Sequence, residues 1–317
     1  MDPLTAALDQ LEVGPPVIAA NLAMYPLLVP VESAPGYLTL DEALAAGLAT
    51  VTEVSESGSV PELLVKNTAK QPVLILDGEE LVGAKQNRIV NLTILVAAAQ
   101  TLHIPVSCVE AGRWVRRSRE FATAGRAHYA SGRAQKLEQV SLAMRESGER
   151  LADQCAVWAD IDEKSRRMHA ESDTRAAAEM YERSRAKLEA FVAGLEPVPR
   201  QAGALFVVNG TIAGMDVFDS PSTWRKSMRK LVHSYGLDAL DRADSAPRRT
   251  TPRPGRFLSA LKDAERERFP AIGVGDDVRL TGRDVVGGGL VVGDTVVHLV
   301  AFPGPKRRGR PRERREE

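Results

Sequence analysis

The densest polar run of the sequence, DGEELVGAKQNR, lies between two apolar segments and extends over Asp77–Arg88. A carboxylate beside a lysine and an arginine can act as a base, bind a metal ion or position a phosphate group. The alternative interpretation is an exposed hairpin whose charges are only solvated, and the spacing alone leaves both open. The candidate residues of this run are Glu79, Glu80, Lys85, Gln86, Asn87 and Arg88.

The alternation of an extended backbone divides these candidates between two faces. Glu79 and Glu80 would point in opposite directions and could not both face one pocket. The same rule places Gln86 and Arg88 together on one face, and Lys85 with Asn87 on the other. An extended run therefore offers each face a mixture of charge and hydrogen-bonding groups.

A second polar run, IPVSCVEAGRW, extends over Ile104–Trp114 and ends a strand with Cys108 and Glu110 on one face. A nearby negative charge raises the pKa of a thiol, so Glu110 would not activate Cys108. We interpret Cys108 as a core residue, and likewise Cys155, which lies on the apolar face of a predicted helix. The candidate residues of this run are Glu110, Arg113 and Trp114.

Known catalytic and metal-binding motifs are absent from the sequence. The five histidines form no His-x-His, His-x-x-x-His or His-Glu-x-x-His pattern, and neither a Walker A nor a Gly-x-Gly-x-x-Gly pattern occurs. Two cysteines cannot form a disulfide framework or a cysteine-based zinc cage. We therefore predict no metal site and no cofactor.

The stretch Arg113–Arg133 is strongly basic, with six arginines against one glutamate and a local charge of +5. Trp114, Phe121 and Tyr129 are interleaved with these arginines. Guanidinium groups and aromatic faces are suited to binding phosphates and stacking on bases. The arginines could instead pair with acidic residues of the helices that follow, and the sequence leaves the two interpretations open.

The C-terminal segment PKRRGRPR contains Arg-Gly-Arg-Pro, which resembles an AT-hook that lays arginines in the minor groove of DNA. We expect residues 305–317 to form a disordered basic tail. Its Arg308 and Arg310 would make weak, non-specific contact with nucleic acid at most.

The overall composition is that of a globular protein. Hydrophobic residues make up 44% and charged residues 26% of the 317 residues, and 42 basic side chains balance 42 acidic ones. This balance excludes a disordered chain and a whole-molecule field that would attract nucleic acid or membranes. The longest apolar runs fall short of the ~18 residues of a membrane helix. The first ten residues lack a basic signal-peptide region, so we expect a cytoplasmic protein.

The elements that must position the polar runs are short strands in the first third of the chain. Runs rich in valine, isoleucine and leucine, separated by turn residues, predict an antiparallel sheet or sandwich. Thr39 and Glu42 form a capping box before a short helix. The strand-like runs are Thr50–Val54, Leu63–Lys66, Val73–Leu76, Arg88–Val96 and Ile104–Val109.

The middle of the chain is helical, and the last third is mixed. Apolar residues at helical spacing predict two long helices, over about 137–158 and 177–195, that form an αα-hairpin. Asn209-Gly210 predicts a type I′ hairpin turn. Ser220-Pro221 predicts the start of a helix, with Gly236 as its C-terminal cap. Another helix is expected over Ser259–Arg268.

We therefore predict an α+β fold with an antiparallel, β-rich sheet or sandwich core, an inserted long αα-hairpin and a disordered basic C-terminal tail. One domain would span residues 12–304. It would comprise a β-rich part at 12–114, the helical hairpin at 115–198 and a mixed part at 200–304, followed by the tail at 305–317.

The two polar runs, together with the later segment Asn209–Asp219, resemble the ARG and Rhodanese-Phosphatase-superfamily-associated protein family. The resemblance spans most of Pro16–Phe302. It implies a domain of unknown activity, associated with ADP-ribosylglycohydrolase and rhodanese-phosphatase proteins. That association implies a setting in ADP-ribose, NAD or nucleotide metabolism and a protein partner from it.

Two hypotheses follow. In the first, the two polar runs converge and bind an anionic, nucleotide-like small molecule, with Glu79, Glu80 and Glu110 as catalytic groups if the protein is an enzyme. Lys85, Gln86, Asn87, Arg88, Arg113 and Trp114 would hold the ligand. In the second, the protein is a non-catalytic module that docks a protein partner or nucleic acid through its helices, basic stretch and tail. The sequence does not decide whether the protein is an enzyme.

Overall fold

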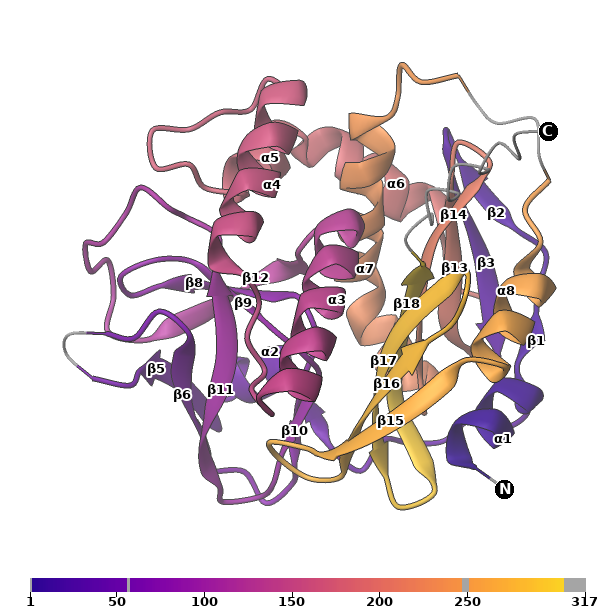
Figure 1. The fold of residues 1–317 in the computed structure, drawn as a ribbon, viewed down its shortest axis with the longest axis horizontal. Coiled ribbons are helices and arrows are strands. Elements are labelled where there is room, and N and C mark those ends of the chain that lie inside the picture. The colour runs from indigo at the N-terminus through magenta and orange to yellow at the C-terminus, as the bar shows by residue number, and fades with distance from the viewer. Residues whose placement is uncertain (1, 56–57, 247–250, 305–317) are drawn as a thin grey trace, which may run out of the picture.

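The computed structural model describes residues 2–55, 58–246 and 251–304 and contains two groups of strands with helices between them (Figure 1). Over these residues the larger group is one antiparallel sheet of nine strands, drawn from the N-terminal segment and the last third of the chain. They are β1 (Glu12–Val13), β2 (Val17–Ala19), β3 (Leu22–Leu28), β13 (Gln201–Val208), β14 (Thr211–Phe218), β15 (Glu265–Pro270), β16 (Asp276–Thr281), β17 (Val285–Val292) and β18 (Thr295–Pro303). Their order is β1-β3-β13-β14-β18-β17-β16-β15, and β2 also pairs with β3.

The second group contains both polar runs. In the described part of the chain it has a six-stranded and a three-stranded sheet. The strands of the six-stranded sheet are β5 (Ala49–Glu53), β6 (Glu62–Asn67), β8 (Glu79–Gly83), β9 (Arg88–Val90), β11 (Thr101–Cys108) and β12 (Phe121–Ala127), in the order β12-β8-β9-β11-β6-β5. The three-stranded sheet has the order β10-β7-β4 and consists of β4 (Leu38–Thr39), β7 (Val73–Ile75) and β10 (Ile94–Val96).

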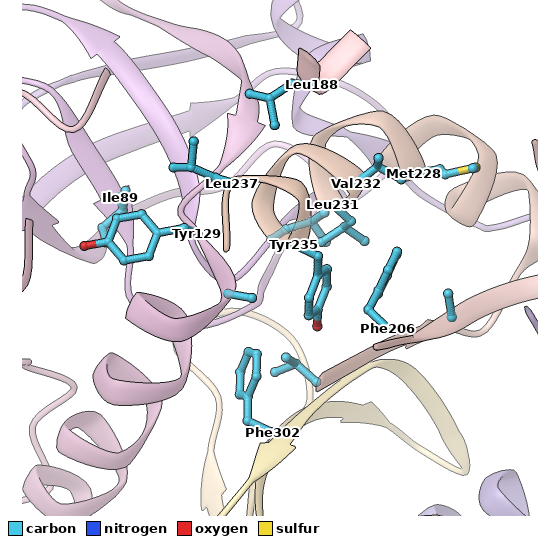
Figure 2. Packing of buried hydrophobic residues seen from close by; sticks show 14 of the residues in the cluster. Ile89, Tyr129, Leu188, Phe206, Met228, Leu231, Val232, Tyr235, Leu237 and Phe302 are labelled. Carbon is cyan, nitrogen blue, oxygen red and sulfur yellow. The ribbon is translucent and has the colours of Figure 1, made fainter. Parts of the chain in front are cut away.

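The long helix α7 (Pro221–Asp241) is the main packing element between the two groups. Its neighbours include β12 of the six-stranded sheet, β13 of the nine-stranded sheet and α6 (Arg185–Gly194). Figure 2 shows its apolar side chains, among them Leu231 and Tyr235, on the side of Phe206. The rings of Phe206 and Tyr235 stack with centroids 4.1 Å apart. The described helices are α1 (Pro3–Gln10), α2 (Leu40–Ala45), α3 (Ala130–Glu146), α4 (Gln154–Arg167), α5 (Ala178–Arg183), α6 (Arg185–Gly194), α7 (Pro221–Asp241) and α8 (Pro254–Lys262).

Buried charged side chains also join α3 to both groups of strands. Arg133 donates to Asp216 Oδ1 at 2.5 Å and to Asp77 Oδ2 at 3.2 Å, and Lys136 donates to Asp77 as well. His298 Nε2 lies 3.2 Å from Asp216 Oδ1. The residues come from α3, β14, β18 and the turn after β7, so their ion pairs and hydrogen bonds tie the sheets together. We call these five residues the central ion network.

The predicted α+β class with mostly antiparallel sheets is confirmed, as are the elements with strong local signals. Thr39 and Glu42 make both hydrogen bonds of the capping box. Asn209 and Gly210 have φ angles of 48° and 76°, as a type I′ turn between β13 and β14 requires. Ser220 caps α7, and Pro221 is its first residue.

The predicted αα-hairpin is wrong in its detail. Over residues 115–198 the structure has β12 and then four helices, α3 to α6, in place of two long ones. The predicted first helix is interrupted because Gly148 adopts a φ of +78° after α3 and Asp153 then caps α4. The predicted second helix is divided at Ser184, between α5 and α6.

Three further predictions need correction. Gly236 does not end a helix but lies inside α7, where a Cβ would come within 3.1 Å of Leu188 and of Phe191 in α6. The helix expected over Ser259–Arg268 begins earlier, as α8, and gives way to β15. Cys155 is exposed because it lies in the first, solvent-facing turn of α4.

Asp77-Gly78 does form a turn, but β7 and β8 on either side of it pair with other strands. The predicted tail, including Arg308 and Arg310, lies outside the described residues. Each helix that the structure describes is too short or too polar to cross a membrane.

Candidate functional site

The first part of the Asp77–Arg88 run is held by ion pairs inside the protein. Glu79 Oε1 accepts from Lys230 Nζ at 2.6 Å, and its Oε2 accepts from the Leu76 N–H at 3.0 Å. Glu80 receives two hydrogen bonds from Arg126, at 2.6 and 3.1 Å. Burial lowers the pKa of Arg126, but Glu80 outweighs this effect and raises it above its ordinary value. These contacts connect β8 with α7 and β12.

The register of the sheet separates Glu80 from the end of its own run. Glu80 lies opposite Ile89, whereas Leu81 lies opposite Arg88. Because paired residues share a face and neighbours alternate, Glu80 points away from the face that carries Arg88. Glu79 and Glu80 therefore bind Lys230 and Arg126, and not residues of the second run.

The last part of the first run meets the second run directly. Glu110 Oε2 accepts from the Asn87 N–H at 3.1 Å and pairs with Arg113 Nη2 at 2.6 Å. Gln86 Nε2 donates to the Glu110 carbonyl at 3.1 Å. Burial would raise the pKa of Glu110, but the Arg113 guanidinium and the Asn87 N–H lower it below its ordinary value. The structure thus brings Gln86, Asn87 and Arg88 against Glu110, Arg113 and Trp114.

Arg113 uses its guanidinium to hold the loop around it. Its Nη1 donates to the carbonyls of Ala84 and Val115 at 2.9 and 3.1 Å. Its Nη2 donates to Asn87 Oδ1 at 3.0 Å and to the Gly83 carbonyl at 3.3 Å. With these bonds and its pairing to Glu110, Arg113 acts as a brace that connects the two polar runs.

Arg88 differs from Arg113 because much of its hydrogen-bonding capacity is unused. Its Nη1 donates to Gln86 Oε1 at 2.7 Å. Its Nε and Nη2 are buried and have no hydrogen-bond partner in the described part of the chain, although Arg88 is 0% exposed. The guanidinium carbon lies 5.7 Å from the ring centroid of Trp114, and Lys85 Nζ lies 5.3 Å from the same ring. Trp114 is 46% exposed, so its ring reaches from Arg88 to solvent.

Glu53, which the sequence analysis did not single out, belongs to the same group. Its Oε1 accepts from the Lys85 backbone N–H at 3.4 Å, and its Oε2 is buried with no hydrogen-bond partner among the described residues. Glu53 follows Ala49 and Val51 on the buried face of β5. A carboxylate in phase with an apolar face is a signal that could have identified it. We call Glu53, Lys85, Gln86, Arg88 and Trp114 the Trp114 cluster.

A scan against protein-family models matches residues 10–302 to the ARG and Rhodanese-Phosphatase-superfamily-associated Protein domain, ARPP-1. The chain belongs to this family. The ARPP-1 match includes both polar runs and the whole Trp114 cluster. Neither the search of curated proteins nor the search of solved structures found a match.

In this ARPP-1 domain, burial shifts the pKa values of Arg88 and of the neighbouring Cys108 thiol. It lowers the pKa of the Arg88 guanidinium below its ordinary value, although Cys108 and Glu53 act in the opposite direction. It raises the pKa of the Cys108 thiol, against the effects of the Glu110 N–H and Arg88. The thiol donates to Gln86 Oε1 at 3.1 Å and is fully buried, as the interpretation of Cys108 as a core residue expects.

The basic stretch of the ARPP-1 domain does not form one continuous surface. Phe121 and Tyr129 are core residues with 3% and 0% exposure. Half of the arginines are buried in ion pairs with acidic residues, and half are exposed. The buried ones are Arg113, Arg126 and Arg133, and the exposed ones are Arg116, Arg117 and Arg119.

The exposed arginines lie in the loop that follows Trp114. Its backbone is fixed against the first polar run, since the Arg117 N–H donates to the Ala84 carbonyl at 2.8 Å. Ser118 Oγ accepts from the Ala84 N–H at 2.9 Å. The positive side chains of this loop therefore start from an anchored backbone next to the Trp114 cluster. Within the part of the chain that the structure describes, no group of three or more His, Cys, Asp or Glu residues is arranged to hold a metal ion.

Proposed function

We propose that the Trp114 cluster binds an anionic, nucleotide-like ligand of the class that includes ADP-ribose, NAD and nucleotides. The observation that carries this proposal is the Arg88 guanidinium, which is fully buried while its Nε and Nη2 have no partner among the described residues. An unpaired buried donor costs about 1–3 kcal/mol, and more if it is charged. A ligand that accepts its hydrogen bonds would account for such a group at a site with other charged residues.

The type of side chain indicates the chemistry of the ligand. The planar guanidinium presents Nε and Nη2 as a fork that matches two oxygens of a phosphate. Lys85 adds a second positive charge near the same indole ring. The exposed part of Trp114 offers an aromatic face on which a base can stack. Phosphate and base recognition are thus provided by three neighbouring side chains.

The contacts favour binding over proton transfer by the carboxylates predicted to be catalytic. Glu79, Glu80 and Glu110 each hold an ion pair with a basic residue of the protein. A general base must instead reach a proton of the ligand. The proposal is therefore a binding function, with Arg88, Lys85 and Trp114 as the ligand-binding residues.

Isothermal titration with ADP-ribose, NAD, ADP and AMP tests the proposal. We expect heat of binding with at least one of them and quenching of tryptophan fluorescence as a base stacks on Trp114. Arg88→Gln removes two charge-assisted hydrogen bonds, so it should weaken binding at least about tenfold. Arg256→Gln is the matched control, because Arg256 has a 75% exposed side chain on α8. The absence of heat with all four ligands, or an unchanged affinity in a folded Arg88→Gln variant, would contradict the proposal.

A second candidate function rests on the loop after Trp114. Arg116, Arg117 and Arg119 are exposed, and so are Trp114 and Val115, at 46% and 71%. This composition is suited to docking single-stranded nucleic acid or an acidic protein partner. Retention on immobilised single-stranded DNA should then fall with salt and disappear when the three arginines are replaced by glutamine. Loss only in an Arg308→Gln/Arg310→Gln variant would assign the retention to the tail instead.

A further inference from the structure

Glu53 is a buried carboxylate with an unused oxygen next to the proposed phosphate site. The residue is 7% exposed, and its Oε2 makes no hydrogen bond to any residue that the structure describes. A carboxylate repels a phosphate, so this oxygen favours an uncharged hydrogen-bond donor of the ligand over its phosphate. Glu53 therefore constrains which part of the ligand can lie beside it.

The position of Glu53 Oε2 relative to Trp114 follows from the space around Gly58. A Cβ built on Gly58 would lie 3.4 Å from Glu53 Oε2, 3.5 Å from Trp114 Cζ2 and 3.2 Å from Lys85 Cδ. All three atoms border one point, so no two of them are more than about 7 Å apart. Glu53 thus acts on the same small volume as the indole ring and Lys85.

The chemistry of a nucleotide supplies a suitable donor between its base and its phosphate. Ribose hydroxyls are uncharged donors, and acidic side chains are a common means of binding them in nucleotide sites. The base and the phosphate of the proposed ligand are already matched by Trp114 and Arg88. The ribose links these two parts of the ligand, and Glu53 Oε2 is an unused acceptor beside Trp114 for one of its hydroxyls.

Resting on the proposed function, we propose that Glu53 accepts a hydrogen bond from a ribose hydroxyl and makes the site selective for ribonucleotides over deoxyribonucleotides. Glu53 is then a specificity-determining residue, Arg88 binds phosphate and Trp114 stacks on the base. The proposal assigns a use to each of the unpartnered buried atoms of the Trp114 cluster.

Titrations of the full-length protein with ADP, 2′-deoxy-ADP and 3′-deoxy-ADP test this inference. A hydrogen bond to a charged group contributes about 1.5–3 kcal/mol, so removal of the hydroxyl that Glu53 binds should weaken binding about tenfold to a hundredfold. In Glu53→Gln the ratio of the ADP affinity to the deoxy-ADP affinity should fall toward one. In Glu62→Gln, a matched change of a half-exposed glutamate in β6, the ratio should stay at the wild-type value.

The outcomes separate this inference from the proposed function. Equal affinity of the wild type for all three nucleotides overturns the role of Glu53 and leaves nucleotide binding standing. A wild-type preference that persists unchanged in Glu53→Gln also overturns it, because the charged acceptor then contributes nothing to the selectivity. If Glu53→Gln does not fold, Glu53→Asp is the second variant, because it keeps the charge and shortens the side chain by one methylene. The ratio of its ADP affinity to its deoxy-ADP affinity should then also fall toward one, and an unchanged ratio overturns the inference. If no nucleotide binds at all, both proposals fail.

Discussion

The central ion network and the Trp114 cluster are both buried and charged, yet they use their charges in opposite ways. In the network, Arg133 is bonded to both Asp77 and Asp216, and Asp216 is also bonded to His298 and to the Tyr235 hydroxyl. In the cluster, Arg88 keeps two buried nitrogens without a partner among the described residues.

One short polar run supplies both regions, since Asp77 is its first residue and Arg88 its last. Burial of charge alone therefore does not identify a binding site. The two regions differ in how many of the buried nitrogens of their central arginine have partners.

The largest expected effect is on stability and comes from the network. Asp216→Asn removes the charge that faces Arg133 and leaves this guanidinium with Asp77 as its remaining acidic partner. Breaking one side of a buried ion pair costs about 3–5 kcal/mol, and we expect a loss in the free energy of unfolding of this size. Urea unfolding measures it, with the exposed turn residue change Asp294→Asn as a control. A loss below about 1 kcal/mol would show that the network is not structural.

The stability lost in Asp216→Asn should depend on pH. Burial would raise the pKa of Asp216, but Arg133 and His298 lower it below its ordinary value. A carboxyl whose pKa is lowered by folding stabilises the protein above its unfolded-state pKa of about 3.9, and this stabilisation is lost as the pH falls toward the folded-state pKa. The difference in unfolding free energy between wild type and Asp216→Asn should therefore shrink from pH 5 to pH 3. A constant difference over this range would contradict the assigned pKa direction.

The parts of the fold that could be predicted from the sequence have local causes. The capping box of Thr39 and Glu42 and the Asn209-Gly210 turn are formed within four residues and occur as predicted. The αα-hairpin was mispredicted because the apolar spacing continues across the break at Gly148. The interior position of Gly236 could not be predicted either, since its reason is the close approach of α6.

The candidate site shows the same division. Alternation correctly placed Gln86 beside Arg88 and gave Glu79 and Glu80 different partners. The separation of Glu80 from Arg88 was not predicted, because it depends on the register across the turn between β8 and β9. The partner of Glu79, however, is Lys230, which lies 151 residues along the chain, and no local pattern indicates that pairing. Glu53 lies 35 residues before Arg88 in the sequence. It reaches the candidate site only because the sheet brings β5 near the first polar run.

Gly58 offers a smaller and more selective test. Gly58→Ala places a side chain at a φ of +77° and within 3.5 Å of Glu53 Oε2, Lys85 Cδ and Trp114 Cζ2. The backbone strain should cost about 1–2 kcal/mol. Gly293→Ala is the matched control, because Gly293 has a φ of +58° and nothing within 4 Å of its Cβ position. Both variants should lose stability, and only Gly58→Ala should weaken the binding of ADP. Equal binding by the two variants would exclude the volume beside Gly58 from the ligand site.

Replacement of Arg88 should have the smallest effect on stability. It tests most directly whether the Trp114 cluster differs from the central ion network. Arg88→Met removes a buried guanidinium that contacts the Gln86 and Cys108 side chains and makes a cation–π contact with Trp114. It also removes the desolvation penalty of the two unpartnered nitrogens, and replacement of a poorly paired buried charge by an apolar side chain of similar size is often close to neutral. We expect a free energy of unfolding within about 1 kcal/mol of wild type, together with loss of ADP binding.

The contrasting change is Arg133→Met, which removes a guanidinium that is fully paired. It leaves Asp216 and Asp77 short of a buried positive charge, so urea unfolding should reveal a loss of about 3–5 kcal/mol. Equal losses in Arg88→Met and Arg133→Met would mean that Arg88 stabilises the fold as Arg133 does. In that case the unpartnered nitrogens of Arg88 would not mark a ligand site. A stable Arg88→Met variant that no longer binds ADP would show instead that this charge is kept for the ligand, because the fold does not need it.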